Sequence, residues 1–157
     1  MISPEVLRRF PFFSFMRHDQ LREVAMITDE VKKKKGQILF NADEDANYCY
    51  VLLEGAIDLH YIVVDENEPE LRNEFVVGTI NPGEVLGISA VIEPYVYTTT
   101  AVVIHDSRLL KIDAVALNEL CGSDAELDNG LQRMVAKATM QRLHATRVLL
   151  AAATGPE

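Results

Sequence analysis

The alternation of hydrophobic and polar positions divides the chain into three zones. In the first, residues 1–30, the pattern predicts short helices. Ser3 and Pro4 favour the start of one helix, because serine caps helix ends well and proline suits the first helical position. Asp19 is expected to cap a second helix. The apolar face of that helix would consist of Leu21, Val24, Ala25 and Thr28.

The second zone, residues 31–112, has the pattern of short strands separated by turns. Segments rich in β-forming residues predict strands at 38–40, 48–53, 56–64, 75–80, 97–104 and 108–112. Turn signals stand at Glu54-Gly55, Asn81-Pro82-Gly83 and His105-Asp106-Ser107. Short strands at near-regular spacing are typical of a β-sandwich or β-barrel.

The third zone, residues 113–153, is helical. Asp113 is expected to cap a short helix that runs through Leu120, and Ser123 with Glu126 fits the S-x-x-E capping box of a long helix to about Ala153. That long helix carries an apolar stripe at heptad spacing: Leu127, Leu131, Met134, Ala138, Gln141, Ala145, Val148 and Ala152. The stripe is too long for one small barrel to cover. We therefore expect a homodimer through residues 124–153, the alternative being a helix folded back on its own sheet.

Composition places the chain among soluble globular domains. Its 157 residues are enough for one domain with a real core, here 1–157, and no apolar run reaches the roughly 18 residues of a membrane span. The N-terminus lacks a signal peptide, and Cys49 and Cys121 are isolated thiols of the kind found in reducing compartments. We expect a cytoplasmic protein with no membrane contact. A net charge of −9 also argues against nucleic acid as a partner of these residues by themselves.

The sequence offers little to support catalysis. The four histidines, His18, His60, His105 and His144, stand alone, and neither a G-x-S-x-G elbow nor a Walker-type loop occurs. We expect no enzyme, no catalytic residue, no metal site and no cofactor. A cupin-type metal enzyme remains as a third alternative, because jelly-roll strands can hold metals, but it would need further ligands near His60.

The order of helices, jelly-roll strands, short helix and long helix resembles the cyclic nucleotide-binding domain over about residues 5–150. Three stretches carry the resemblance: LRRFPFFSFMRHDQLREVAMI (7–27), KKGQILFNADEDANYCYVLLEGAIDLH (34–60) and INPGEVLGISAVI (80–92). The resemblance implies a mainly β fold, a cyclic-nucleotide-binding-like jelly-roll barrel at 31–112 between N-terminal helices at 1–30 and C-terminal helices at 113–153. It also implies a regulatory role in signal transduction.

The phosphate-binding cassette of that family supplies the candidate site. Its pattern is a glycine, a glutamate for the ribose, and about nine residues later an arginine for the phosphate, followed by small hydroxyl residues. Laid on this sequence, the glycine is Gly87, Ile88 falls at the glutamate and Tyr97 at the arginine. A rival register from Gly83 and Glu84 places another acid at the arginine position. The candidate ligand residues are Gly87, Ile88, Ser89, Ala90, Tyr97, Thr98, Thr99 and Thr100.

Loss of both polar anchors argues against tight binding of cyclic AMP. A charge-assisted arginine–phosphate contact contributes on the order of 2–5 kcal/mol. Two functions therefore stay open: a sensor for a different small effector, and a ligand-free dimerisation or scaffold module whose barrel is filled. They differ in whether a cavity persists beside Gly87. The long helix is not followed by a helix-turn-helix, so we expect a stand-alone sensor or one part of a longer regulator.

Overall fold

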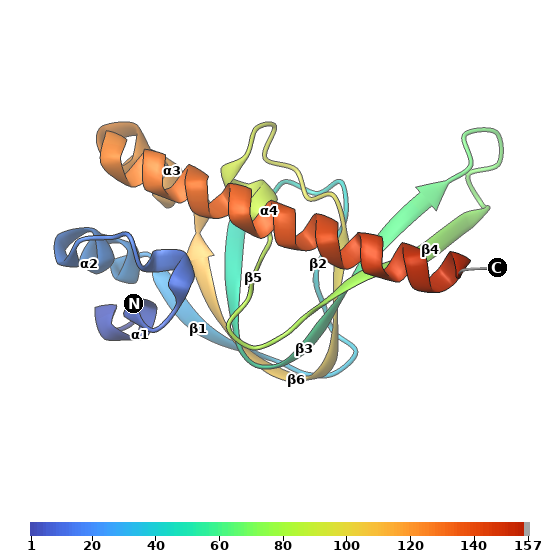
Figure 1. Ribbon diagram of the computed structural model, residues 1–157, viewed down its shortest axis with the longest axis horizontal. Helices are drawn as coiled ribbons and strands as arrows, with labels where there is room; N and C mark the ends of the chain where they lie inside the picture. The colour runs from blue at the N-terminus through green and yellow to red at the C-terminus, as the bar shows by residue number, and fades with distance from the viewer. Residues whose placement is uncertain (156–157) are drawn as a thin grey trace.

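The computed structural model describes residues 1–155, and its short helices gather at one end of the strands while the long C-terminal helix runs across them (Figure 1). The elements are α1 (Pro4–Arg8), the 3-10 helix η1 (Pro11–Phe13), α2 (His18–Met26), β1 (Thr28–Lys33), β2 (Ile38–Phe40), β3 (Tyr48–Val64), β4 (Arg72–Ile80), β5 (Val85–Leu86), the 3-10 helix η2 (Ile88–Val91), β6 (Thr100–Asp113), α3 (Ala114–Ser123) and α4 (Ala125–Thr154).

The strands form one antiparallel, strongly bent sheet. Its main path runs β1-β6-β3-β4, while β2 pairs with β6 and β5 pairs with β3. Within residues 1–155 the sheet does not close on itself. The predicted jelly-roll architecture with flanking helices and a long C-terminal helix is confirmed, in an open form of the barrel (Figure 1).

The predicted turns at Glu54-Gly55 and at His105-Asp106-Ser107 are wrong. The first lies within the continuous strand β3 and the second within the continuous strand β6. Gly55 adopts φ +103°, and the pairing of β3 with β6 shifts register between Leu52 and Ile57. A Cβ on Gly55 would lie 2.1 Å from the Oγ of Ser107, so the two backbones meet closely here. The glycine permits a bulge that bends both strands together, rather than a turn that ends them.

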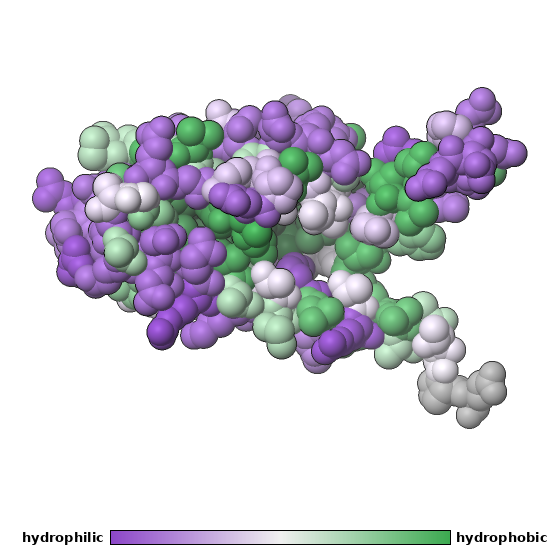
Figure 2. All heavy atoms as spheres, turned by 90° about the horizontal axis from the view of Figure 1, so that it is seen from above, coloured by the Kyte–Doolittle hydropathy of each residue, from purple (hydrophilic) through white to green (hydrophobic). Residues whose placement is uncertain are grey.

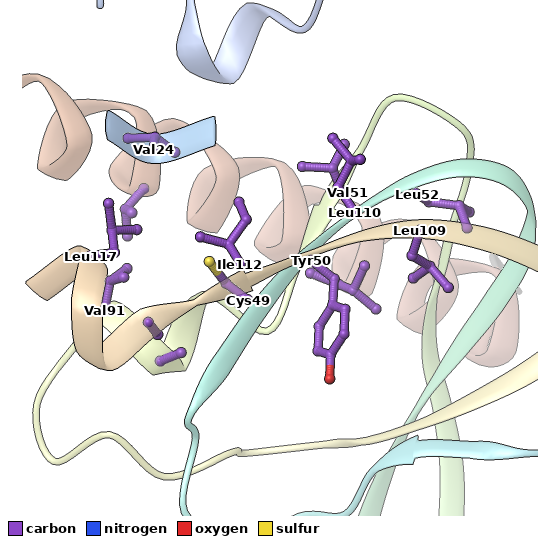
Figure 3. Packing of buried hydrophobic residues seen from close by; sticks show 14 of the residues in the cluster. Val24, Cys49, Tyr50, Val51, Leu52, Val91, Leu109, Leu110, Ile112 and Leu117 are labelled. Atoms are coloured by element: carbon purple, nitrogen blue, oxygen red, sulfur yellow. The ribbon is translucent and has the colours of Figure 1, made fainter. Parts of the chain in front are cut away.

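The hydrophobic core lies between these two long strands and the helices (Figure 3). Buried side chains of β3 and β6 meet residues of α2, α3 and η2. Figure 3 labels ten of them: Val24, Cys49, Tyr50, Val51, Leu52, Val91, Leu109, Leu110, Ile112 and Leu117. Burial raises the pKa of the Cys49 thiol to about 12, so it behaves as a small apolar side chain.

Two of the predicted helix starts are confirmed. The Ser3 hydroxyl accepts a hydrogen bond from the backbone N–H of Glu5, and the carboxylate of Asp113 accepts one from the N–H of Ala116. Both residues are the N-caps of their helices, as their side chains predict.

Two other predicted starts are wrong by one or two positions. The cap of α2 is Arg17, whose N–H donates to the side-chain oxygen of Gln20, so Asp19 lies inside the helix. The cap of α4 is Asp124, and Ser123 is the last residue of α3. Serine and aspartate both cap well, so the S-D pair alone does not decide which residue does so.

The long helix α4 crosses the open side of the sheet (Figure 1). Its first half is buried against its own domain through Leu127, Leu131, Val135 and Ala138. Farther along, large apolar side chains are exposed: Met140, Leu143, Val148, Leu149 and Leu150. None of the helices in residues 1–155 combines the length and apolar character needed to cross a bilayer.

Candidate functional site

A cavity of about 430 Å³ lies between the segment that follows β5, the strands β4 and β5, and the helix α4. Figure 2 shows the molecule hollowed beside α4, with hydrophobic side chains on much of the wall. The lining residues from the strands and from α4 include Phe40, Leu59, Val77, Val85, Ala138, Thr139, Arg142, Leu143 and Thr146. Its volume falls within the usual range for sites that bind small molecules.

Gly87 stands where the chain turns into the short helix η2. It adopts φ +72° and ψ +28°, the left-handed conformation that glycine takes without strain. A Cβ there would lie 3.2 Å from the carbonyl oxygen of Tyr48 and 3.4 Å from the Cε1 atom of Tyr97. The position therefore needs glycine for both its conformation and its close packing, as the resemblance implies.

Tyr97 is the residue that the predicted alignment of the cassette places at the arginine position. Its side chain is only 4% exposed and stacks on Phe40, with ring centroids 3.9 Å apart and planes 10° apart. Its hydroxyl donates to the carbonyl oxygen of Tyr48 at 2.6 Å. Burial raises the pKa of Tyr97 to about 12, so the side chain is neutral at physiological pH. An uncharged aromatic ring thus replaces the cation in the wall.

The other predicted residues divide into two groups. Six of the eight line the cavity: Gly87, Ile88, Ser89, Tyr97, Thr98 and Thr99. Ala90 is buried beneath it, and its carbonyl accepts a hydrogen bond from the side chain of Asn118 at 3.0 Å. Thr100 is also buried, and its hydroxyl accepts from the N–H of Ala42 at 3.0 Å. These two residues fix the surrounding segments through their hydrogen bonds, and neither lines the cavity.

Sequence reasoning missed the contribution of α4 to the site. Thr139, Arg142 and Thr146 line the cavity, although the sequence analysis placed no site residue on this helix and expected it to form a dimer or to fold back on its own sheet. One signal was available: Arg142 follows Val135 and Ala138 at i+7 and i+4, so a cation falls on the face that packs inward. Only the tertiary structure shows that this face meets the cassette.

The site contains no arrangement suited to metal binding. Among residues 1–155, no three histidine, cysteine, aspartate or glutamate side chains lie close enough together to hold an ion. His60 instead lies 3.4 Å from the carboxylate of Glu74 on the outer part of the β3–β4 hairpin. The described residues that line the cavity offer apolar contact, hydroxyl groups, the guanidinium of Arg142 and the carboxylate of Glu93.

A comparison with protein-family models gives the class. The model of the cyclic nucleotide-binding domain matches residues 30–124, which is more than half of the chain. The chain belongs to the cyclic nucleotide-binding domain family. No curated protein matches it.

Solved structures agree with this assignment. A structure named as a cyclic nucleotide-binding protein from Geobacter metallireducens is 31% identical, with a TM-score of 0.79, and the match covers 92% of this chain and 100% of that one. The N-terminal domain of a transcriptional regulator from Streptomyces coelicolor is 25% identical, with a TM-score of 0.63. That match covers 87% of this chain and 93% of the other. The sensor domain of the transcriptional regulator DNR from Pseudomonas aeruginosa, at 19% identity and a TM-score of 0.68, shares the fold over 89% and 90% of the two chains.

Proposed function

We propose that this chain is a regulatory sensor module whose cavity binds a small effector other than a cyclic nucleotide held in the family's usual mode. The observation that carries the proposal is the cavity of about 430 Å³ beside Gly87, which stays open although Tyr97 takes the arginine position. A ligand-free scaffold would be expected to fill this space with side chains, because protein interiors are close-packed.

The chemistry of the wall disfavours a cyclic phosphate. Tyr97 is neutral, and its hydroxyl already donates a hydrogen bond to the carbonyl oxygen of Tyr48. Ile88 offers no acceptor for a ribose hydroxyl. Among the described residues that line the cavity, Arg142 is the only cation, and its Nη2 atom is paired with Glu84 at 2.7 Å. A phosphate would lose its water and meet only a guanidinium whose charge is already paired with Glu84.

The arrangement of helices supports a route from ligand to output. α4 forms part of the cavity wall, so a ligand would touch it directly. The hydrogen bond from Asn118 to Ala90 also links α3 to η2, and α3 leads into α4. A ligand that binds one position of α4 better than another would shift the population toward that position.

The output we propose is a homodimer through residues 124–153, in the cytoplasm and without catalytic activity or nucleic-acid binding by these residues alone. The exposed apolar side chains beyond Ala138 on α4 support a partner helix. The net charge of −9 is consistent with a module that passes its signal to protein rather than to nucleic acid.

A thermal-shift series tests the sensor function. The pure chain is heated with cyclic AMP, cyclic GMP, cyclic dinucleotides and a panel of uncharged and acidic metabolites, each at about millimolar concentration. A ligand at about 100 times its dissociation constant adds roughly 2.7 kcal/mol and raises Tm by several degrees. We expect no shift with cyclic AMP or cyclic GMP and a shift with at least one metabolite.

Two variants show whether a shift arises in the cavity. Ser89→Phe places a ring in the cavity and is expected to abolish the shift, whereas Val115→Phe changes an exposed position of α3 and is expected to preserve it. A shift with cyclic AMP that Ser89→Phe removes would overturn the proposed change of ligand. Absence of any shift would favour the ligand-free module.

A further inference from the structure

Arg142 is held in the cavity wall instead of extending into solvent. Its side chain is 25% exposed and its Nη2 atom donates to the Oε2 atom of Glu84 at 2.7 Å, while Glu84 itself is 31% exposed. The other oxygen of Glu84 accepts from the backbone N–H of Asn81 at 2.9 Å, which fixes the carboxylate. The pair therefore fastens the guanidinium between α4 and the turn that precedes β5.

The second guanidinium nitrogen of Arg142, Nη1, is buried and has no hydrogen-bond acceptor among residues 1–155. Gly78 of β4 leaves room for it, since a Cβ at that position would lie 3.1 Å from Nη1. A buried donor without a partner is destabilising, and more so when it is charged. Arg142 borders the cavity, so an acceptor on a bound molecule would reach Nη1 only if the guanidinium rotated away from Gly78.

The charges around the cavity favour an uncharged acceptor. Arg142 contributes one positive charge, its partner Glu84 one negative charge, and Glu93, which lines the cavity, another. One positive and two negative groups leave no net positive field to attract an anion. A carbonyl oxygen can accept from the guanidinium without repulsion from either carboxylate.

The other side chains that line the cavity indicate the chemical character of the rest of the ligand. Leu59, Val77, Ile88, Val96 and Leu143 are among the side chains that border the space, so a bound molecule gains most from apolar surface. We infer, on the basis of the proposed sensor function, that the cavity binds an uncharged, largely apolar molecule carrying a carbonyl group, and that Arg142 donates Nη1–H to that oxygen.

Three probes of nearly equal shape test the inference by equilibrium dialysis against the full chain. They are 2-acetylnaphthalene, which has a carbonyl, 2-ethylnaphthalene, which has none, and 2-naphthoate, which is an anion. A hydrogen bond to a charged donor predicts that the ketone binds on the order of tenfold more tightly than the hydrocarbon. The ketone is also expected to bind more tightly than the acid.

Two substitutions separate the hydrogen bond from the apolar contact. Arg142→Met is expected to remove the preference for the ketone and to leave the affinity for 2-ethylnaphthalene within about twofold, since apolar burial persists. Glu84→Gln removes a negative charge and keeps an oxygen for the N–H of Asn81, so it is expected to raise the affinity for 2-naphthoate. Thermal melting followed by circular dichroism verifies that each variant folds.

The outcomes are distinguishable from failure of the sensor proposal. Equal binding of ketone and hydrocarbon, or a ketone preference that survives Arg142→Met, would overturn the role of Arg142 while the cavity remains a ligand site. Tighter binding of the acid would overturn the uncharged ligand class. Binding of none of the three would overturn the inferred ligand class, whereas the sensor function is decided by the thermal-shift series. If Arg142→Met does not fold, Arg142→Lys tests the same point, because lysine keeps the charge but lacks the second guanidinium nitrogen.

Discussion

Tyr97, the predicted counterpart of the cassette arginine, forms a neutral part of the cavity wall. It stacks on Phe40, donates its hydroxyl proton to the Tyr48 carbonyl and packs against Gly87. Because the ionised form would be buried, the pKa of Tyr97 is raised to about 12. The side chain therefore acts as a neutral structural part of the wall, and that role has a measurable dependence on pH.

Stability is expected to fall as pH rises from about 10 to about 12. In that interval a tyrosine in the unfolded chain has lost its proton while Tyr97 in the folded protein retains it, so the unfolded state binds fewer protons. Tyr97→Phe is expected to cost about 1 kcal/mol near neutral pH, through the lost hydrogen bond to Tyr48, and to reduce the alkaline decline. Urea unfolding at several pH values measures both effects.

The exposed residue Tyr61 provides the control for this measurement. Tyr61→Phe removes a hydroxyl that is in contact with solvent and is expected to leave the alkaline decline unchanged. Tyr50, whose pKa is also raised by burial, is present in every variant and cancels from the comparison. A decline that is identical in wild type and Tyr97→Phe would show that Tyr97 is not buried as described.

At the scale of elements, the start of α4 links the N-terminal helices to the C-terminal helices. The carboxylate of Asp124 accepts from the N–H of Leu127 at 3.0 Å and from the side chain of Gln20 in α2 at 3.0 Å. The hydrogen bond from Gln20, with that from Leu127, holds the pKa of Asp124 below its ordinary value. One side chain thus caps the long helix and positions it against α2.

Asp124→Ala is expected to lower the free energy of unfolding by about 1–2 kcal/mol, because it removes the cap and the contact with Gln20 together. Ser123→Ala, one residue earlier, is the matched control and is expected to change it by no more than about 0.5 kcal/mol. Chemical denaturation measures both variants. A larger loss in Ser123→Ala would mean that serine, not aspartate, starts the helix.

On the scale of the whole molecule, α4 has two different faces. One face closes the cavity and the core through Leu131, Val135 and Ala138, whereas Met140 and Leu150 on the other side are 63% and 62% exposed. A helix that is apolar on its outer face favours a second helix as cover. Ligand binding and dimerisation would then act on opposite sides of the same element.

We expect the chain to form a dimer in solution and the double variant Met140→Glu/Leu150→Glu to be monomeric, because two charges per helix would be buried in the interface. Size-exclusion chromatography with light scattering gives the mass of each. Met26→Glu, at an exposed position at the end of α2, is the control and should stay dimeric. A monomeric wild type would contradict the dimer, and a double variant that remains dimeric would contradict an interface on α4.

The sequence by itself determined the broad order of helices, strands and helices and the caps Ser3 and Asp113, because strand alternation and cap residues are local signals. The jelly-roll class came from the resemblance to the family, and the assignment of Gly87 and Tyr97 to a cassette stays a prediction. The same local signals failed where the outcome depended on a distant partner. Gly55 is a turn signal in sequence, yet it forms a bulge because β6 lies against it.

Only the tertiary structure decided what surrounds the cassette. It placed Arg142 beside residues far away in sequence and kept the space next to Gly87 open. Within residues 1–155 it also left the Nη1 atom of Arg142 without an acceptor. The packing of α4 across the sheet also divided one apolar stripe into an inner and an exposed part. Periodicity shows which side chains share a helix face, but the partner of that face is set by the packing of the whole chain.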